Sequence, residues 1–382
     1  MTRYANICYS LAFILVMVAL ALASLPGALS FSTTKDASLL DGRLTSTFEK
    51  HYDKGFVLKD FGTNAWAALE FSLFGEGRPG VVIGRDEWLY TAEEFNPPAS
   101  LQQINDNWRL MQGVKRELER RDIELVVLML PAKARLYPEH LGEQKPVRLQ
   151  QELYADARQR MQRLGLQGPD LLSALEAGKR EGQVFLRTDT HWTPYGSSVV
   201  ADAVAKYLQA RDWPTGETRY TTEVVGNETH KGDLLTYLPL DPYFVALQPK
   251  QEPLEKRVTE QGEEGGDLFG ASAPELALVG TSYSANPKWN FLGALRQSLS
   301  TDLYNYAEDG HGPLVPMLRL LAKGEEETRD IKLVLWEVPE RYLAMPSDLA
   351  EFDPQWLAQL QGTPEQTERL ALKGAAKPLA AH

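Results

Sequence analysis

Three nearly uninterrupted apolar runs constrain the fold of this chain more than any other feature. They cover 123–130, 276–279 and 331–338. Apolar residues at successive positions, rather than at alternate ones, are typical of strands covered on both faces of a parallel sheet. A shorter run at 303–306 predicts a further strand. The runs therefore predict an α/β fold with a mainly parallel sheet between helices.

Segments around these runs have the periodicity of amphipathic helices. In residues 101–121 the apolar side chains recur with helical spacing. Pro194 suits the first position of a helix that continues to Leu208. Two short strands around a turn at 84–86 are expected within 78–90. Further helical segments are predicted at 149–164, 289–299 and 314–322.

The N-terminal segment is almost continuously apolar from Ile7 to Leu25, with only Arg3 charged before it. A run of this length can cross a bilayer as a helix. It is therefore a signal peptide or a signal anchor. Because the small residues at 21–23 lie inside the apolar run, where cleavage is disfavoured, we favour the uncleaved anchor.

Composition excludes several classes of function. The single cysteine, Cys8, lies in the apolar N-terminal segment, so the exported part has no thiol nucleophile, thiolate metal site or disulfide. The formal net charge of −12 argues against binding of nucleic acid, which needs a basic surface to displace counterions. The same charge disfavours broad contact with an anionic polysaccharide, which would need a locally basic cleft or only brief contact.

A catalytic constellation is predicted from two separate segments. Asp189 and His191 are two residues apart in the short segment 187–196, and Ser282 follows the apolar run at 276–279. A serine at the end of a buried strand is exposed and directed outward. Its hydroxyl needs a base, and the base needs a third group that fixes its tautomer. Ser282 as nucleophile, His191 as base and Asp189 as orienter would form the triad of an acyl-transfer enzyme.

Neighbours of Ser282 complete this prediction. Ser284 is the rival nucleophile, but it would lie further into the following turn, so Ser282 is preferred. The backbone N–H groups of Ser282 and Gly280 are candidate donors to an oxyanion hole. Thr281 is expected to be structural.

Cationic side chains follow two of the predicted strands, at the sheet edge that should carry Ser282. Lys133 and Arg135 come after the first run, and Arg341 comes after the last. There they would project over the rim of the site and hold a uronic acid carboxylate or polarise an acyl carbonyl. Plain surface charge is the alternative, and Arg341 would alternatively pair with Glu337 or Glu340.

Aromatic side chains also accompany the predicted triad. Trp192, Tyr195 and Tyr283 are close to it in the sequence. They could stack on a sugar ring, although at least one of them is expected to pack around the Asp–His pair instead.

An alternative interpretation is a metal site formed by Asp189, His191, His230 and His311. Carboxylates and imidazoles are suitable zinc ligands, but no spacing such as His-x-x-x-His supports such a site. The sequence therefore predicts neither a metal nor another cofactor.

The Asp-Thr-His-Trp segment at 189–192 and the Gly-Thr-Ser-Tyr-Ser segment at 280–284 resemble the alginate O-acetyltransferase family of AlgJ and AlgX. The resemblance extends over about residues 50–345 and includes the segments 66–73 and 77–89. It implies an SGNH-hydrolase-like three-layer sandwich. It also implies a permuted order of motifs, because the serine comes first in ordinary SGNH enzymes and last here.

The resemblance implies a function as well as a fold. Ser282 would be acetylated, with His191 as general base and acid and Asp189 as its orienter. The family implies a periplasmic protein at the inner membrane that acetylates mannuronate units of alginate with a membrane-bound O-acyltransferase (AlgI), AlgF and AlgX. AlgX-like members add a C-terminal carbohydrate-binding module. Because only a short segment follows Arg341, we expect an AlgJ-like chain without that module.

Several points stay open at this stage. The acceptor is a mannuronate hydroxyl or a nucleophile on a partner protein, and the acetyl donor is not identified. An acetylesterase would use the same covalent intermediate, and a non-catalytic scaffold of the acetylation complex is an alternative from another class.

The domain organisation follows from these expectations. Residues 1–30 would be the signal peptide or anchor, 31–75 an N-terminal collar, 76–345 the SGNH-like catalytic domain and 346–382 a partly disordered tail. Within the catalytic domain, the segment 245–267 is rich in Glu, Gln, Lys and Gly and predicts a solvated surface loop.

Overall fold

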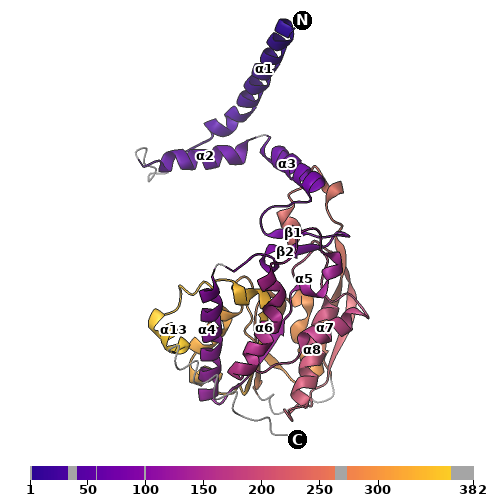
Figure 1. Ribbon diagram of the computed structural model, residues 1–382, viewed down its shortest axis with the longest axis vertical. Helices are drawn as coiled ribbons and strands as arrows, with labels where there is room; N and C mark the ends of the chain where they lie inside the picture. Colours follow the sequence, from indigo (N-terminus) through magenta and orange to yellow (C-terminus); the bar gives the residue numbers. More distant parts are fainter. Residues whose placement is uncertain (1, 33–40, 57, 99, 263–272, 363–382) are drawn as a thin grey trace. The chain divides into compact units, whose positions relative to one another are not determined.

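The chain folds into two compact units, which are described separately (Figure 1). One unit comprises Met1–Arg78 and Leu238–Gln248, and the other comprises Pro79–Tyr237 and Pro249–His382. The structure, a computed structural model, describes residues 2–32, 41–56, 58–98, 100–262 and 273–362.

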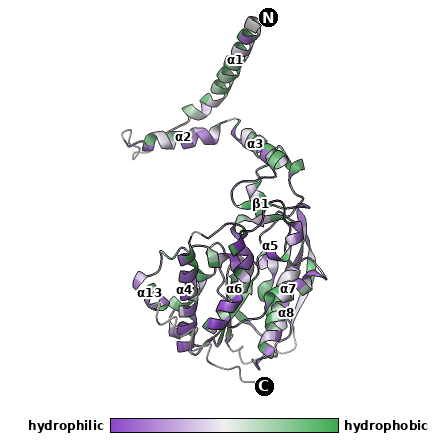
Figure 2. Cartoon of the chain, viewed as in Figure 1, coloured by the Kyte–Doolittle hydropathy of each residue, from purple (hydrophilic) through white to green (hydrophobic). Residues whose placement is uncertain are grey.

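The smaller unit consists of α1 (Thr2–Leu29), α2 (Arg43–Gly55), α3 (Lys59–Phe74) and the short 238–248 segment. Most of α1 is hydrophobic (Figure 2). Among the described residues, Tyr4–Leu29 is the one helix that is long and apolar enough to cross a membrane. Both a signal peptide and a signal anchor have this property.

The larger unit is built on a four-stranded parallel sheet, as predicted. Its strand order is β3-β8-β6-β7, and every pairing is parallel. The three long apolar runs supply the three strands β3, β8 and β6, and the shorter run supplies the edge strand β7. The strands are β3 (Glu124–Leu130), β8 (Leu333–Pro339), β6 (Leu276–Val279) and β7 (Leu303–Asn305).

Successive side chains of these strands enter two different apolar cores. Leu128 and Leu335 face one core, and Val127 and Trp336 face the other. Burying one such side chain stabilises the fold by about 2 kcal/mol. Both faces of the sheet are therefore covered, which explains why the strands are apolar at nearly every position.

Each core is closed by a layer of helices (Figure 1), so the predicted three-layer α/β architecture is confirmed. The helices α7 and α8 lie side by side over one face, with α10. The outward faces of α4 and α6, over the other face, are hydrophilic (Figure 2). One layer contains α7 (Leu171–Lys179), α8 (Pro194–Gln209) and α10 (Phe291–Leu299), and the other contains α4 (Leu101–Arg120), α6 (Arg148–Leu164) and α11 (Leu314–Ala322).

Local signals in the sequence explain where these elements begin and turn. Pro194 is the first residue of α8, and the hydroxyl of Thr193 caps it by accepting the N–H of Gly196 at 2.9 Å. The predicted pair of short strands is also present, as the antiparallel β1 (Val81–Ile83) and β2 (Leu89–Thr91).

The surface loop expected at 245–267 is wrong in its central part. There β5 (Glu252–Gln261) pairs with β4 (Tyr220–His230) in an antiparallel ribbon. Helices α8 and α10 contact the ribbon, but most of its residues are exposed, Val224 and Val258 included. Because the half-buried positions of its strands, such as Thr222, Arg257 and Thr259, are polar, the strands lack the alternating apolar pattern by which a strand is recognised. Residues 263–267 lie outside the described part.

The segment expected as a C-terminal tail contains a packed helix, α13 (Pro354–Gln361). Its Leu360 is buried against α4. A side chain at Gly113 of α4 would clash with the Leu360 carbonyl, so this close approach needs a glycine. The disorder expected from about residue 371 lies outside the described residues.

The remaining elements are short. They are α5 (Lys133–Leu136), α9 (Ser282–Ala285), α12 (Glu325–Thr328) and the 3₁₀ turns η1 (Ala92–Glu94), η2 (Pro138–His140), η3 (Asp233–Tyr237), η4 (Val245–Leu247), η5 (Pro287–Trp289) and η6 (Glu340–Ala344).

Candidate active site

The predicted base and its orienter lie in the base loop, residues 187–191, between α7 and α8. An antiparallel bridge between Phe185 and Trp192 brings the two ends of this loop together. His191 Nδ1 lies 2.7 Å from Asp189 Oδ1, and the backbone N–H of His191 donates to the same oxygen at 2.9 Å. These two bonds fix the imidazole relative to the carboxylate.

The predicted nucleophile faces the other nitrogen of that imidazole. Ser282 is the first residue of α9, directly after β6, and its Oγ lies 2.7 Å from His191 Nε2. The structure thus brings Ser282, His191 and Asp189 into one chain of hydrogen bonds. Ser282 is 9% exposed and the His191 side chain 11% exposed, so the reacting atoms are accessible but largely shielded from water.

The rival nucleophile Ser284 has a different hydrogen-bond partner. Its Oγ donates to Glu337 Oε2 at 3.1 Å, on the central strand β8. Ser282 is therefore the serine that the structure pairs with His191.

Glu337 was missed by the sequence reasoning, and it organises the turn that carries Ser282. It is 1% exposed and accepts the backbone N–H of Thr281 at 2.7 Å and the Thr281 hydroxyl at 3.0 Å. A Cβ at Gly280 would clash with the same carboxylate. Burial raises the pKa of Glu337, and the hydrogen bonds from Thr281 and Ser284 oppose that rise. The Gly-Thr-Ser-Tyr-Ser segment thus fits around one carboxylate, and the oxyanion role of Gly280 stays a prediction.

The second oxygen of Asp189 is also occupied. His230 Nε2 lies 2.8 Å from Asp189 Oδ2, and the backbone N–H of Asp233 donates to that oxygen at 3.0 Å. Burial alone would raise the pKa of Asp189, but the hydrogen bonds from His191 and His230 hold it well below its usual range. Partial desolvation, followed by the charge of Asp189, raises the pKa of Asp233.

The polar groups considered for a metal are already bonded to one another. Ligand atoms of Asp189, His191 and Asp233 lie within 4.8 Å of one another. However, Asp233 Oδ1 accepts the Thr190 N–H at 2.8 Å, and both oxygens of Asp189 have donors. His311 lies beside Glu308 instead. This arrangement is that of a hydrogen-bond network around a base.

Lys133 does not project over the rim, so that prediction is wrong. The turn α5 directs its side chain beneath the base loop, where it is 1% exposed and Nζ donates to the carbonyls of Arg187 at 2.9 Å and Asp189 at 2.8 Å. Burial lowers its pKa to about 8, against the opposing effect of nearby carboxylates such as Glu94. Lys133 therefore supports the loop from within.

Arg341 is also buried, so the prediction that it projects over the rim is wrong, and so is the alternative pairing with Glu337 or Glu340. Its Nε donates to Glu93 at 2.8 Å, and a terminal nitrogen lies 3.2 Å from the Tyr283 hydroxyl. That hydroxyl in turn donates to the carbonyl of Thr190 in the base loop at 2.6 Å. The guanidinium thus points into the protein and supports the base loop through Tyr283.

Arg135 pairs at the surface side of the same turn. Its Nε donates to Glu340 at 3.0 Å, and its terminal nitrogens donate to the carbonyls of Gln150 and Gln151, both at 2.9 Å. Its guanidinium is engaged by the protein itself, so the structure gives no support for its predicted role in holding a substrate carboxylate.

The aromatic residues divide between packing and an open surface. Trp192 is fully buried and packs edge-on against the buried Tyr283 at 5.1 Å, so neither presents a face to a sugar. Both have the packing role that was expected of at least one aromatic residue here, and the substrate contact predicted for Trp192 is wrong. Trp289, which the sequence reasoning missed, stacks on the His191 ring at 5.0 Å.

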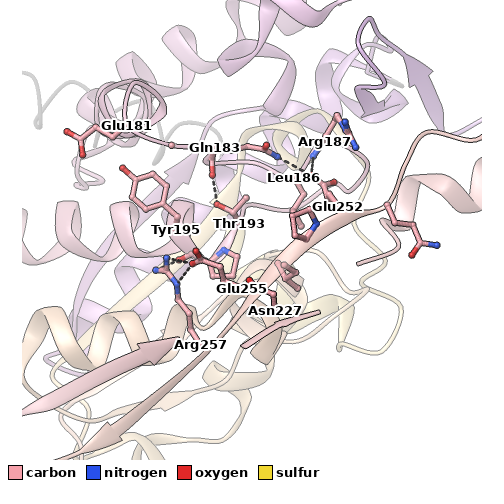
Figure 3. A pocket seen from close by; sticks show the side chains of 15 residues that line it. Glu181, Gln183, Leu186, Arg187, Thr193, Tyr195, Asn227, Glu252, Glu255 and Arg257 are labelled. Carbon is pink, nitrogen blue, oxygen red and sulfur yellow. Dashed lines mark hydrogen bonds and ion pairs between the residues drawn. The ribbon is translucent and has the colours of Figure 1, made fainter. Parts of the chain in front are cut away.

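Tyr195 lines a separate pocket of about 790 Å³ between residues 181–195 and the β4–β5 ribbon (Figure 3). Arg257 on its wall pairs with Glu255 at 2.6 Å. No member of the triad lines this pocket.

Known proteins of one family are similar to the chain over most or all of its length. Residues 81–340 match the family described as SGNH hydrolase-like domain, acetyltransferase AlgX. The chain is 50% identical to the probable alginate O-acetylase AlgJ of Azotobacter vinelandii, and the match covers 100% of both chains.

Two solved structures are similar to the chain. The O-acetyltransferase domain of Pseudomonas putida AlgJ has a TM-score of 0.69 and 46% identity, over 74% of this chain and 99% of that domain. Pseudomonas aeruginosa AlgX has a TM-score of 0.54 and 25% identity, over 69% of this chain and 66% of its own.

Proposed function

The chain belongs to the AlgJ and AlgX family of SGNH hydrolase-like acetyltransferases, and we propose that it is an alginate O-acetyltransferase that carries the acetyl group on Ser282. The observation that carries the proposal is the unbroken hydrogen-bond chain from Asp189 through His191 to Ser282, with both bonds at 2.7 Å. The name of the relatives, alginate O-acetylase, supports the acetyl group and the polymer.

In the first step, Ser282 Oγ attacks the carbonyl carbon of an acetyl donor while its proton passes to His191 Nε2. The carboxylate of Asp189, hydrogen-bonded to Nδ1–H, stabilises the imidazolium that forms. His191 then gives the proton to the leaving group, the donor bond breaks, and an acetyl ester remains on Ser282. The low pKa of Asp189 keeps the orienting group charged throughout.

In the second step, an acceptor hydroxyl gives its proton to His191 and attacks the acetyl-Ser282 ester. The ester bond breaks, Ser282 Oγ regains the proton, and the acetyl group leaves on the acceptor. The small exposure of Ser282 and His191 supports transfer to a hydroxyl over hydrolysis by water. The acceptor is a mannuronate unit of alginate or a nucleophile on a partner protein that relays the group.

The location and partners form part of the same proposal. α1 would hold the protein at the periplasmic side of the inner membrane. An AlgI-like membrane-bound O-acyltransferase would deliver the acetyl group, and AlgF-like and AlgX-like proteins would complete the complex. The formal charge of −12 supports a relay through a partner, because an anionic polymer is repelled by an acidic surface.

The test is to incubate the full-length protein with p-nitrophenyl acetate and to follow intact mass and peptide maps. We expect an adduct of about 42 Da on Ser282, from acetyl replacing a hydrogen. Ser282→Ala and His191→Ala should lose the adduct. Ser284→Ala is the matched control, because its hydroxyl bonds Glu337 rather than His191, and it should keep the adduct.

The outcomes separate the alternatives. An adduct that transfers to oligomannuronate identifies the transferase, whereas an adduct that only water removes identifies an acetylesterase. A folded wild-type protein with no adduct and no ester turnover would refute the proposal and favour a scaffold.

A further inference from the structure

The β4–β5 ribbon, which no part of the proposed mechanism uses, ends directly on the base loop. Every residue of β4 except the last is exposed or half-buried, whereas His230 at its end is 6% exposed. Its partner in the register is Glu252, the first residue of β5, which is also buried. The last rung of a mostly exposed ribbon thus places an imidazole and a carboxylate inside the protein, next to the buried Leu254 of β5.

Both residues of this rung bind the base loop. Glu252 accepts the backbone N–H groups of Arg187 at 2.9 Å and Thr188 at 2.8 Å. His230 Nε2 lies 2.8 Å from Asp189 Oδ2. A Cβ at Gly232 would clash with the Thr188 carbonyl, so the chain after His230 also runs close against the loop.

We propose that His230 is a positioning residue for the acetyl transfer, acting through Asp189: its Nε2–H holds the second carboxylate oxygen so that the first stays aligned with His191. This inference rests on the proposed function of the triad. An ionised carboxylate only accepts hydrogen bonds, so His230 must carry its proton on Nε2. Two donors then occupy each oxygen of Asp189, which leaves the group little freedom to rotate.

A shared aromatic neighbour couples the two imidazoles. Trp289 stacks on His191 at 5.0 Å with an interplanar angle of 23°, and it meets His230 edge-on at 5.7 Å and 87°. Movement of either ring therefore displaces the indole that contacts the other. His230 reaches the base both through the carboxylate and through this packing.

Loss of the His230 donor has a predictable electrostatic effect. A carboxylate that has lost a hydrogen bond has its negative charge less well stabilised, so it attracts a positive partner more strongly. The protonated form of His191 therefore becomes more stable. The charged groups around the rung are Asp189 and Asp233, Glu252 on the paired strand, and Lys133 beneath the loop. Without His230, Asp189 Oδ2 keeps only the hydrogen bond from the backbone N–H of Asp233. None of these charged side chains takes the place of the lost donor.

The test uses the full-length protein in detergent and measures kcat/KM for p-nitrophenyl acetate from pH 5 to 9 in the wild type, His230→Leu and His230→Gln. We expect His230→Leu to lose about 10- to 100-fold in kcat with KM nearly unchanged. The ascending limb of its plot of kcat/KM against pH should move to higher pH. His230→Gln, whose amide reaches the same place with an N–H donor, should restore most of the rate and return the limb towards its wild-type position. Thr222→Val is the matched control, because it removes a hydrogen bond to Thr259 near the end of the ribbon that lies away from His230.

The inference fails if His230→Leu keeps both rate and profile, or if it loses rate with an unmoved limb and Thr222→Val loses as much. If His230→Leu does not fold, His230→Asn, whose shorter amide does not reach Asp189, takes its place against His230→Gln. Failure of the proposed function would look different, because the wild-type protein itself would then be inert.

Discussion

Replacing Lys133 with methionine tests whether a buried cation can serve catalysis without contacting substrate. The ammonium donates to the carbonyls of Arg187 and Asp189, and bonds of this charged kind contribute about 1.5–3 kcal/mol each. Against them stands the burial of the charge: the fall of its pKa from 10.5 to about 8 corresponds to about 3 kcal/mol. Because these contributions largely offset, Lys133→Met should reduce stability by only about 1–2 kcal/mol.

The effect on activity should be much larger than the effect on stability. Without Nζ the two carbonyls lose the donor that fixes the loop bearing Asp189 and His191, and a small displacement there costs about 100-fold in rate. The rate of acetyl-Ser282 formation is measured with p-nitrophenyl acetate, and stability by urea unfolding. Arg135→Gln is the control, because it removes a cation from the same turn without touching the base loop. An unchanged rate with this neutral ester, together with weaker use of an anionic acceptor, would refute the positioning role and restore Lys133 as a substrate contact.

Two further predictions concern buried glutamates. Gly280→Ala should abolish the Ser282 adduct and lower stability by about 1–3 kcal/mol in urea unfolding, because its Cβ would displace the Glu337 carboxylate, and an adduct at wild-type level would contradict this. Burial, opposed by Arg135, raises the pKa of Glu340 from 4.5 to about 7, so the folded state holds that proton more tightly than the unfolded state. Its stabilising contribution of about 3 kcal/mol is present below pH 4.5 and is lost as the pH rises through 7; Glu340→Gln should flatten this slope, and an unaltered slope would show that another group causes it.

The sheet could be predicted from the sequence because burial on two faces leaves a strong local pattern. In β3 every residue from Val126 to Leu130 is buried, so the pattern needs no knowledge of distant contacts. The β4–β5 ribbon left no such pattern, since most of its side chains face water and its order comes from pairing between two separate segments. A local signal predicts a strand only where the strand supplies its own apolar face.

Part of the candidate site could likewise be predicted from the sequence. Ser282 and the Asp189–His191 pair could be placed because each follows from its own neighbours in the chain. Glu337 and His230 could not, because their roles depend on contacts across 56 and 41 positions. A charged residue inside an otherwise apolar strand was the available signal for Glu337.

The cationic residues show the limit of reasoning from strand ends. The end of β3 correctly located Lys133 at the edge of the sheet that carries the site, but it could not give the direction of a long side chain. That direction depends on the turn α5 and on two carbonyls of a loop more than fifty positions away. Polar residues at this edge therefore divide into those that face substrate and those that hold the loops, and only the three-dimensional structure separates them.

This division also changes how the negative charge of the chain bears on its acceptor. The formal charge of −12 counts every carboxylate, yet five acidic residues of the described part are buried, against two buried cations, Lys133 and Arg341. Burial raises the pKa of Glu94, Glu337 and Glu340, and these carboxyl groups lie inside the protein rather than at its surface. The surface that meets alginate is thus less acidic than the composition states. Repulsion alone does not require a relay, and direct transfer from acetyl-Ser282 to the polymer remains a full alternative to transfer through a partner.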